Sequence, residues 1–357
     1  MTLPDSNIAW VVPENSTSTS HLTKKNLAVP TPGHNQVLIR LTAASLNFRE
    51  VLIALNEILG GFERDGTLQH WIVEDDERVI KAPRNLTAAE SASLKTAGVT
   101  AWSAIRESLD GKFNGELQPW VGDWRSKRLA GKTVLTQGTG GIAAALGATV
   151  IATSSSDSKL AFAKSLGATH LINYTSTPDW DKEALRLTDG KGVDHVIEVA
   201  GAKTLLKSIN STRPGGLISL IGILSEAEDL PKELVPSVLY SGRIIKGCCA
   251  FTRDATAELA RFVEEHNIKP VIAKEFDFED TLEAFEAIQK QNAVGKFLSV
   301  QTYGTHRNYP ITSVIPSYAS VVTKIRDAKE EGGEIKMCGE AGDTEAVGYA
   351  FDMGYFV

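Results

Sequence analysis

The chain has 357 residues, of which 42% are hydrophobic and 23% are charged, a composition typical of a globular protein with one large or two medium domains. The net charge of -7 and the lack of a dense Lys or Arg run argue against nucleic acid and acidic membrane surfaces as partners. The start carries no signal-peptide pattern, and no apolar run reaches the roughly 18 to 20 residues that span a bilayer. We therefore expect a cytoplasmic protein, without a membrane segment, that binds a small-molecule substrate.

The N-terminal part is predicted to be rich in β-structure. Residues 7–12 (NIAWVV), 36–45 (QVLIRLTAAS) and 68–83 (LQHWIVEDDERVIKAP) carry β-branched and aromatic residues between Pro, Gly and Asn. Helical periodicity is scarce before residue 95. We assign residues 1–97 to a β-rich domain.

Strands and helices alternate from residue 98 to residue 262. Short apolar runs bounded by Gly or charged residues are the candidate strands TVLTQ, TVIATS, HLINY, VDHVIEVA, GLISLIGIL and RIIKGCC. Such runs are typical of a parallel sheet that is buried on both faces. The sequence therefore predicts an α/β domain with a doubly wound parallel sheet over residues 98–262.

The C-terminal part divides into two segments. Residues 263–300 are expected to form a strand, an amphipathic helix and a closing strand that returns to the first domain. Residues 301–357 are an appended tail of unknown role, with one predicted helix around residues 318–331 followed by Gly-rich and acidic sequence without a core pattern.

A glycine-rich turn follows the strand TVLTQ. Gly138, Gly140 and Ala143 have the spacing G-x-G-x-x-G/A, in which the glycines allow a tight turn and close approach of a pyrophosphate. The turn follows an apolar strand and precedes an Ala-rich helix, which is the context that the motif requires. We predict dinucleotide binding by Gly138, Gly140 and the first helical residues Gly141 and Ile142.

The choice of cofactor depends on the end of the next strand, where an Asp or Glu would bind the ribose of NAD. This chain has Ser154, Ser155 and Ser156 there, followed by Lys159. Hydroxyl groups and a nearby cation can hold a 2'-phosphate, so Ser154, Ser155 and Lys159 favour NADP, with NAD as the alternative. The serines can also cap the following helix, and the two roles are compatible.

Other functional classes are disfavoured. Three cysteines and no C-x-x-C pair exclude a four-thiolate zinc site. The segment RLAGKT enters a strand and lacks the first glycine of a P-loop. No tyrosine has a lysine four residues later, which the short-chain dehydrogenases require.

Several segments together identify a family. They occur in the order AASLNFREVL, TAGVTAW, VLTQGTGGI, GATVIATSSSDSKLAFAKSLGATHLINY, GVDHVIEVAG, RPGGLISLIGIL and FEAIQKQNAVGKFLSV. From about residue 8 to residue 300 the chain resembles the medium-chain dehydrogenase/reductase family, in its zinc-independent, quinone-reductase-like branch. The resemblance implies a GroES-like catalytic domain from residues 1–97 and 263–300, a Rossmann domain between them, and hydride transfer with a quinone, enone or carbonyl. It also implies a homodimer formed through the edge GLISLIGIL and RIIKGCCAF.

The resemblance also assigns site residues. Zinc-containing members have Cys where this chain has Asn47, so Asn47 implies a zinc-free site in which an amide polarises a substrate carbonyl. Thr100 matches the position beside the nicotinamide, Tyr174 a position beside the adenosine phosphate, and Lys296 a weaker cofactor position. Each of these residues also has a purely structural alternative. Asn47 would then be a turn residue, Thr100 a helix-start residue, Tyr174 an aromatic residue at a strand end and Lys296 a solvated lysine. Gly201 and Gly222 end successive strands at the edge where open sheets bind ligands.

The chain departs from the family pattern in two places. A segment with a GSDGAGEV-like strand is missing after LNFREVLIALN, which shortens the GroES-like domain and leaves strand edges unpaired. The helix after the glycine turn is about two turns shorter than in the family, or roughly seven residues at 3.6 residues per turn. The alternatives to an active enzyme are therefore a degenerate nucleotide-binding or interaction protein, or a defective gene product.

Overall fold

The computed structural model describes residues 6–13, 15–55, 66–109, 129–138, 141–222, 225, 231–248, 252–290, 293–301 and 321–323. The predicted Gly140 and most of the tail lie outside these residues. The chain folds as two compact units, of which unit 1 comprises Met1–Val99 with Phe251–Val357 and unit 2 comprises Thr100–Ala250. The domain boundaries at residues 97 and 262 stay predictions, and residue 262 lies inside helix α9 (Arg253–Glu265) of unit 1.

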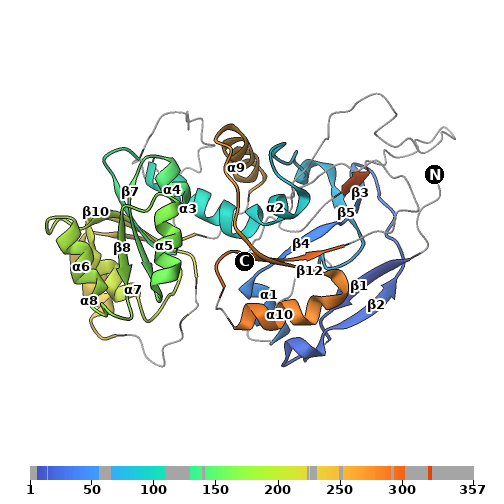
Figure 1. The fold of residues 1–357 in the computed structure, drawn as a ribbon, viewed down its shortest axis with the longest axis horizontal. Coiled ribbons are helices and arrows are strands. Elements are labelled where there is room, and N and C mark those ends of the chain that lie inside the picture. The colour runs from blue at the N-terminus through green and yellow to red at the C-terminus, as the bar shows by residue number, and fades with distance from the viewer. Residues whose placement is uncertain are drawn as a thin grey trace. The chain divides into compact units, whose positions relative to one another are not determined.

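Within the described residues, unit 2 is built on a six-stranded parallel sheet of order β11-β10-β9-β6-β7-β8 (Figure 1). Its strands are β6 (Thr133–Gln137), β7 (Thr149–Ser154), β8 (His170–Asn173), β9 (Val193–Glu198), β10 (Thr212–Leu220) and β11 (Ile244–Gly247). Its helices are α4 (Gly141–Ala145), α5 (Asp157–Ser165), α6 (Trp180–Leu187), α7 (Leu205–Ser211) and α8 (Leu234–Ser241), and α3 (Val99–Leu109) begins at the boundary of the units. Read from β8, this is the Rossmann order 3-2-1-4-5-6, so the predicted doubly wound fold is confirmed.

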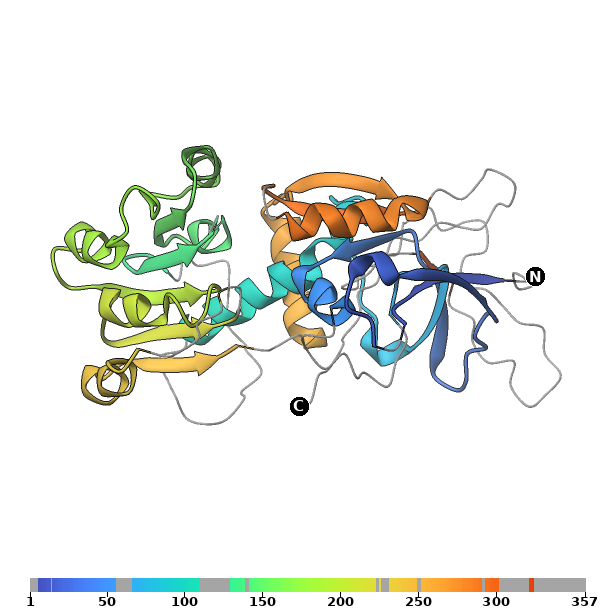
Figure 2. The same cartoon turned by 90° about the horizontal axis from the view of Figure 1, so that it is seen from below.

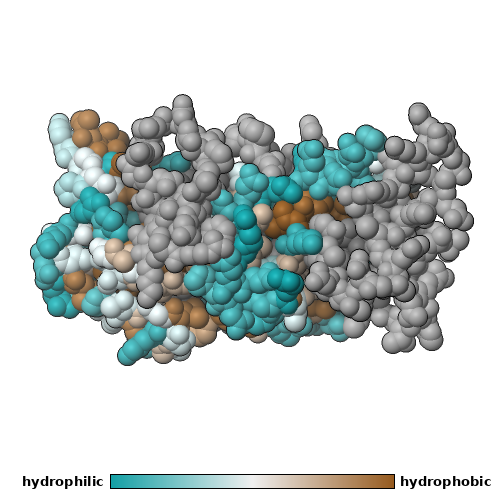
Figure 3. Space-filling model, turned by 90° about the horizontal axis from the view of Figure 1, so that it is seen from above, coloured by the Kyte–Doolittle hydropathy of each residue, from teal (hydrophilic) through white to brown (hydrophobic). Residues whose placement is uncertain are grey.

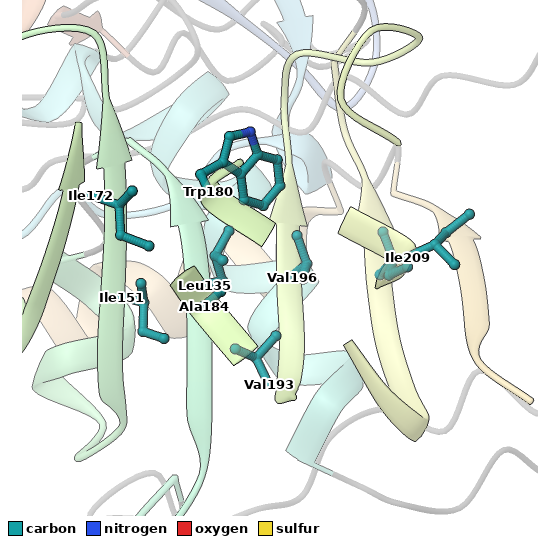
Figure 4. Close-up of a cluster of buried hydrophobic side chains, with 9 residues drawn as sticks. Leu135, Ile151, Ile172, Trp180, Ala184, Val193, Val196 and Ile209 are labelled. Carbon is teal, nitrogen blue, oxygen red and sulfur yellow. The ribbon is translucent and has the colours of Figure 1, made fainter. Parts of the chain in front are cut away.

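The core of unit 2 is a row of apolar side chains in register across the sheet. Leu135 of β6 lies opposite Ile151 of β7 and Val196 of β9, and Val196 lies opposite Ile218 of β10. Trp180 and Ala184 of α6 and Ile209 of α7 pack against this row (Figure 4). Helices cover the faces of the sheet, which explains why its strands are the short apolar runs that the sequence shows.

The crossover after the glycine turn is as short as the sequence predicts. Helix α4 has five residues, and Gly147, with φ of 89°, ends it. The N–H groups of Gly147 and Ala148 donate to the carbonyls of Ala144 (2.9 Å) and Ala143 (3.1 Å), which is a Schellman cap. This cap turns the chain directly from a one-turn helix into β7.

Unit 1 contains three small sheets among its described residues, of orders β1-β2, β12-β13-β4 and β14-β3-β5. Figure 2 shows strands from the beginning of the chain, in blue, and from its later part, in orange, within this unit. Its strands are β1 (Asn7–Val11), β2 (Thr23–Leu27), β3 (Gln36–Arg40), β4 (Ala43–Leu46), β5 (Trp71–Asp75), β12 (Ile272–Asp277), β13 (Lys296–Val300) and β14 (Val321–Thr323). Its helices are α1 (Phe48–Ala54), α2 (Ala88–Ala92), α9 and α10 (Thr281–Gln289), with short turns η1 (Thr19–His21), η2 (Asp76–Arg78), η3 (Leu94–Gly98) and η4 (Phe278–Asp280). Strand β13 pairs antiparallel with β4, so the closing segment joins the N-terminal β-rich part.

Two predicted strands of unit 1 differ from the structure. Residues 36–45 form two strands, because the chain leaves β3 at Leu41 and enters a different sheet as β4. Residues 68–83 contain a strand only at β5, after which Asp76 starts the turn η2. Acidic residues at the end of an apolar run therefore mark the end of the strand.

The helix predicted around residues 318–331 is wrong where the structure describes it. Residues 321–323 form strand β14, which pairs antiparallel with Leu38–Arg40 of β3. The sequence there is Val-Val-Thr, and β-branched residues favour extended backbone over helix. The partner is an edge of β3 that would otherwise offer unpaired N–H and C=O groups.

Helix α9 packs one face into unit 1 and presents the other to water. Its residue Thr256 accepts a hydrogen bond (3.0 Å) from Nζ of Lys95, a lysine that is 0% exposed. The bond to Thr256 gives this buried ammonium group a polar partner. On the face of the molecule drawn in Figure 3, the coloured surface is mostly hydrophilic, with smaller hydrophobic areas between.

Candidate functional site

The carboxyl-terminal edge of the unit 2 sheet carries most of the predicted site residues. The strand order reverses between β6 and β9, and open α/β sheets bind ligands at the carboxyl ends of the strands at this point. Strand β6 ends at Gln137 and β9 ends at Glu198, and the Gln137 amide donates to the Glu198 carboxylate at 2.7 Å. The side-chain oxygen Oε1 of Gln137 accepts from the backbone N–H groups of Val199 (3.0 Å) and Ala200 (2.9 Å). These bonds join the ends of the two strands at this edge of the sheet.

The glycine turn lies at this same edge, directly after the end of β6. Gly138 has φ of 142°, and a Cβ built there would meet no atom within 4 Å. The Thr136 hydroxyl donates to the carbonyl oxygen of Gly138 at 2.9 Å, which holds the start of the turn. Gly141 begins α4, and the carbonyl of Ile142 accepts from the N–H of Leu146 (3.1 Å). Open space beside a glycine with positive φ, ahead of a helix start, fits a dinucleotide pyrophosphate.

The serines that predict NADP lie at the end of β7. Ser154 pairs with Asn173 of β8, and its carbonyl accepts from the N–H of Tyr174 (3.0 Å). Ser155 is exposed, and Ser156 is the N-cap of α5, accepting from the N–H of Lys159. The cap role that the sequence left open therefore belongs to Ser156, and Ser155 is the serine that faces water.

Tyr174 and Asp157 complete this end of the edge. Tyr174 follows β8 directly and is 46% exposed, so its ring is accessible to a bound adenosine. The carboxylate of Asp157, in the first turn of α5, accepts from the Asn173 amide at 2.8 Å. Of the residues expected at the adenosine end, Ser154 and Tyr174 thus lie on two adjacent strand ends, Ser155 follows Ser154, and Lys159 lies in the first turn of α5.

The other predicted residues of unit 2 lie along the second half of the sheet. Gly201 has φ of 91° and bridges to Ser225. A Cβ on Gly222 would overlap the carbonyl oxygen of Val199, so the ends of β9 and β10 approach too closely for a side chain. The carbonyl of Thr100 lies 3.9 Å from the thiol of Cys248, which places the start of α3 beside the end of β11.

A second cluster lies in unit 1, where Asn47 follows β4 and precedes α1. Lys296, the first residue of β13, donates to Oδ1 of Asn47 at 2.6 Å, and the Asn47 amide donates to the carbonyl of Ser45 at 3.2 Å. The Glu50 carboxylate accepts from the backbone N–H of Asn47 at 2.7 Å. Since Oδ1 accepts from Lys296 and one NH2 hydrogen is donated to Ser45, the second NH2 hydrogen is the group of Asn47 that could bind a substrate oxygen.

The two charged groups of this cluster are poorly solvated. Burial raises the pKa of Glu50 above its ordinary value, and burial lowers the pKa of Lys296. Each charge partly offsets the effect on the other. Shifted pKa values in two neighbouring groups are typical both of functional sites and of structural ion pairs. In this structure Lys296 is hydrogen-bonded to Asn47, and its role at the site stays a prediction.

The described residues contain no group of three or more His, Cys, Asp and Glu side chains that could hold a metal ion. The zinc-free interpretation of Asn47 stays a prediction. No helix among the described residues is long and apolar enough to cross a membrane.

Sequence reasoning missed Glu50, Gln137 and Glu198. Glu50 had a signal, because Asn-x-x-Glu is the spacing of a capping box. Gln137 and Glu198 each stand as the polar last residue of an apolar strand, which places them at the ligand-binding edge once the strand order is known.

These features define a Rossmann-type dinucleotide-binding unit and a second unit of small β-sheets, the two parts that make up a nicotinamide-dependent dehydrogenase. Residues 136–265 match the family described as zinc-binding dehydrogenase. A zinc-type alcohol dehydrogenase-like protein of Schizosaccharomyces pombe is 38% identical over 252 residues, which are 68% of this chain and 68% of that protein. The chain belongs to the medium-chain dehydrogenase/reductase family.

Solved structures show the same fold. An NAD-dependent alcohol dehydrogenase superposes with a TM-score of 0.70 at 26% identity, over 83% of this chain and 100% of that chain. A quinone oxidoreductase of Pseudomonas syringae superposes with a TM-score of 0.67 at 20% identity, over 83% of this chain and 100% of the other. The latter likeness concerns the fold alone.

Proposed function

We propose that the protein is an NADP(H)-dependent, zinc-independent oxidoreductase that transfers hydride to or from a quinone, enone, carbonyl or alcohol. The family is one of nicotinamide-dependent oxidoreductases, and the relatives named above are dehydrogenases and quinone oxidoreductases. The observation that carries the proposal is the glycine turn at Gly138, which opens at the strand-order reversal of a Rossmann sheet. The serine-rich end of β7 supports NADP over NAD.

The residues have distinct proposed roles. Gly138, Gly141 and Ile142 hold the pyrophosphate, Ser154, Ser155, Lys159 and Tyr174 hold the adenosine end, and Thr100, Gly201 and Gly222 border the nicotinamide. The bound cofactor supplies the hydride chemistry. Asn47 donates a hydrogen bond from its amide to the substrate oxygen, and Lys296 fixes the orientation of that amide. This assignment moves Lys296 from the cofactor, where the resemblance placed it, to the Asn47 amide.

Cofactor binding tests the proposal directly. NADPH at 100 times its dissociation constant should stabilise the folded protein by about 2.7 kcal/mol, and NADH at the same concentration should stabilise it less. Thermal melting with each cofactor measures this. Ser154→Asp should reverse the preference, because its carboxylate repels a 2'-phosphate, whereas Ser165→Asp at the far end of α5 should not. Stabilisation by neither cofactor would favour a degenerate, non-enzymatic protein.

Asn47 is tested by removing its amide. Asn47→Asp keeps an oxygen for the helix N-cap but loses the NH2 donor, and it should lower kcat with NADPH and a quinone on the order of 100-fold. The matched control is Ser45→Ala, two residues earlier on β4. The Ser45 hydroxyl is buried and has no hydrogen-bond partner in the part of the chain that the structure describes, so its loss should leave kcat unchanged. Equal kcat values for Asn47→Asp and the parent protein would remove Asn47 from the mechanism.

A homodimer through the β11 edge is the proposed assembly. Among the described residues, β11 ends the sheet and has one neighbouring strand. The preceding helix α8 exposes Val235 (73%), Leu239 (69%) and Tyr240 (83%), an apolar face that a partner would cover. Leu239→Glu should give a monomer in sedimentation, whereas Leu171→Glu on β8, at the opposite edge of the sheet, should leave the dimer intact. A parent protein that sediments as a monomer would refute this assembly.

A further inference from the structure

A fully buried carboxylate lies at the strand-order reversal of the unit 2 sheet. Glu198, the last residue of β9, is 0% exposed, and no role proposed above uses it. Its side chain lies between the ends of β6 and β9, because it accepts from Gln137 of the first strand and contacts α7 on the other side. An ionisable group in such a place is costly unless the fold holds it for a reason.

The contacts of Glu198 fit the ionised form. Oε1 accepts from the N–H groups of Ala200 and Gly201, each at 2.9 Å, and from the hydroxyl of Thr204 at 2.7 Å. Oε2 accepts from the Gln137 amide and from the hydroxyl of Ser208. Three of these five donors are N–H groups, which give a hydrogen bond and cannot take one, so both oxygens serve as acceptors.

The Glu198 carboxylate lies in the half of the sheet that would bind the nicotinamide part of a dinucleotide. A Rossmann sheet has two mononucleotide-binding halves, and the glycine turn and the serines assign β6-β7-β8 to the adenosine half. Strands β9, β10 and β11 form the other half, which takes the nicotinamide. Oxidised and reduced cofactors share the adenosine and the phosphates, but only the oxidised ring carries a positive charge. A fixed anion at the start of the nicotinamide half therefore acts differently on the two forms.

We propose that Glu198 is a specificity-determining residue for the oxidation state of the dinucleotide. Its carboxylate strengthens the binding of the oxidised form more than the binding of the reduced form. The inference rests on the proposed function, since it requires a nicotinamide cofactor in the crevice. A unit charge acting across roughly 10 Å at an effective dielectric constant of about 20 changes a binding constant about tenfold. With a nicotinamide cofactor bound, the Glu198 carboxylate would offer a negative charge that favours the oxidised ring over the reduced one.

The test measures the dissociation constants of NADP⁺ and NADPH by calorimetry on the full chain. Glu198→Gln removes the charge at nearly constant volume and should weaken NADP⁺ about tenfold while changing NADPH much less. The double variant Gln137→Glu with Glu198→Gln keeps one carboxylate against one amide but moves the charge to β6, in the adenosine half. Its ratio of the two dissociation constants should lie between those of the parent and the single variant.

The outcomes separate the two proposals. A parent protein that binds neither nicotinamide cofactor overturns both the proposed function and this inference. A parent that binds both forms, with Glu198→Gln weakening them equally or leaving their ratio unchanged, overturns the role of Glu198 alone. If Glu198→Gln does not fold, the double variant decides, because an unchanged ratio after moving the charge refutes the inference.

Discussion

Gly222→Ala is expected to destabilise unit 2 by about 3 kcal/mol, the upper part of the range for inserting atoms into a packed site. A Cβ at this position would overlap the carbonyl oxygen of Val199 and lie 3.0 Å from its carbonyl carbon. Both atoms are backbone, so neither can move aside as a side chain would. Relief requires the ends of β9 and β10 to separate, which would also disturb the turn around Gly201. We therefore expect weaker cofactor binding together with the lower stability.

The measurement is denaturant unfolding of the variant beside a matched glycine control. Gly247→Ala lies at the end of the adjacent strand β11, where a Cβ would meet no atom within 4 Å. That variant should unfold within about 0.5 kcal/mol of the parent, as surface substitutions usually do. If Gly222→Ala is as stable as Gly247→Ala, the close approach of β9 and β10 in this structure is wrong.

The sequence predicts the sheet of unit 2 well because burial on both faces leaves a local signal. Each strand is a short apolar run, and the helices between the strands impose the parallel order. Strand β2 in unit 1 lacks such a signal, since its residues TKKNL are mostly exposed and polar. Strand β14 was missed for a different reason, because pairing with β3 determines its structure and no local pattern reveals that partner.

The candidate site likewise contains local motifs that the sequence predicts and long-range contacts that it does not. The glycine turn and the serine run are local motifs, so their positions follow from the sequence. The bond between Asn47 and Lys296 joins residues 249 positions apart and exists because β13 lies beside β4. The network of Gln137 and Glu198 likewise depends on β6 lying next to β9. Contacts of this kind are set by topology, which composition and spacing do not encode.

The stability of unit 2 is expected to fall in acid because of His195 in the middle of the sheet. His195 of β9 is 1% exposed, and its Nε2 lies 2.9 Å from the hydroxyl of Ser219 on β10, while Nδ1 has no hydrogen-bond partner among the described residues. Burial lowers its pKa from 6.5 to about 3, against the attraction of Asp194. The unfolded chain takes up a proton near pH 6.5, whereas the folded protein does not until about pH 3.

The stability that His195 contributes is therefore complete above pH 6.5 and is lost as the pH falls toward 3. The loss from this one group should be about 2 kcal/mol at pH 5 and about 5 kcal/mol in the limit below pH 3. Denaturant unfolding between pH 8 and pH 5 measures it. The variant His195→Leu with Ser219→Ala removes the titrating ring and its partner together, and it should lose about 2 kcal/mol less over this range than the parent. Ser219→Ala alone keeps the buried ring and should keep the full loss. A double variant with the same acid sensitivity as the parent would show that His195 is not the group responsible.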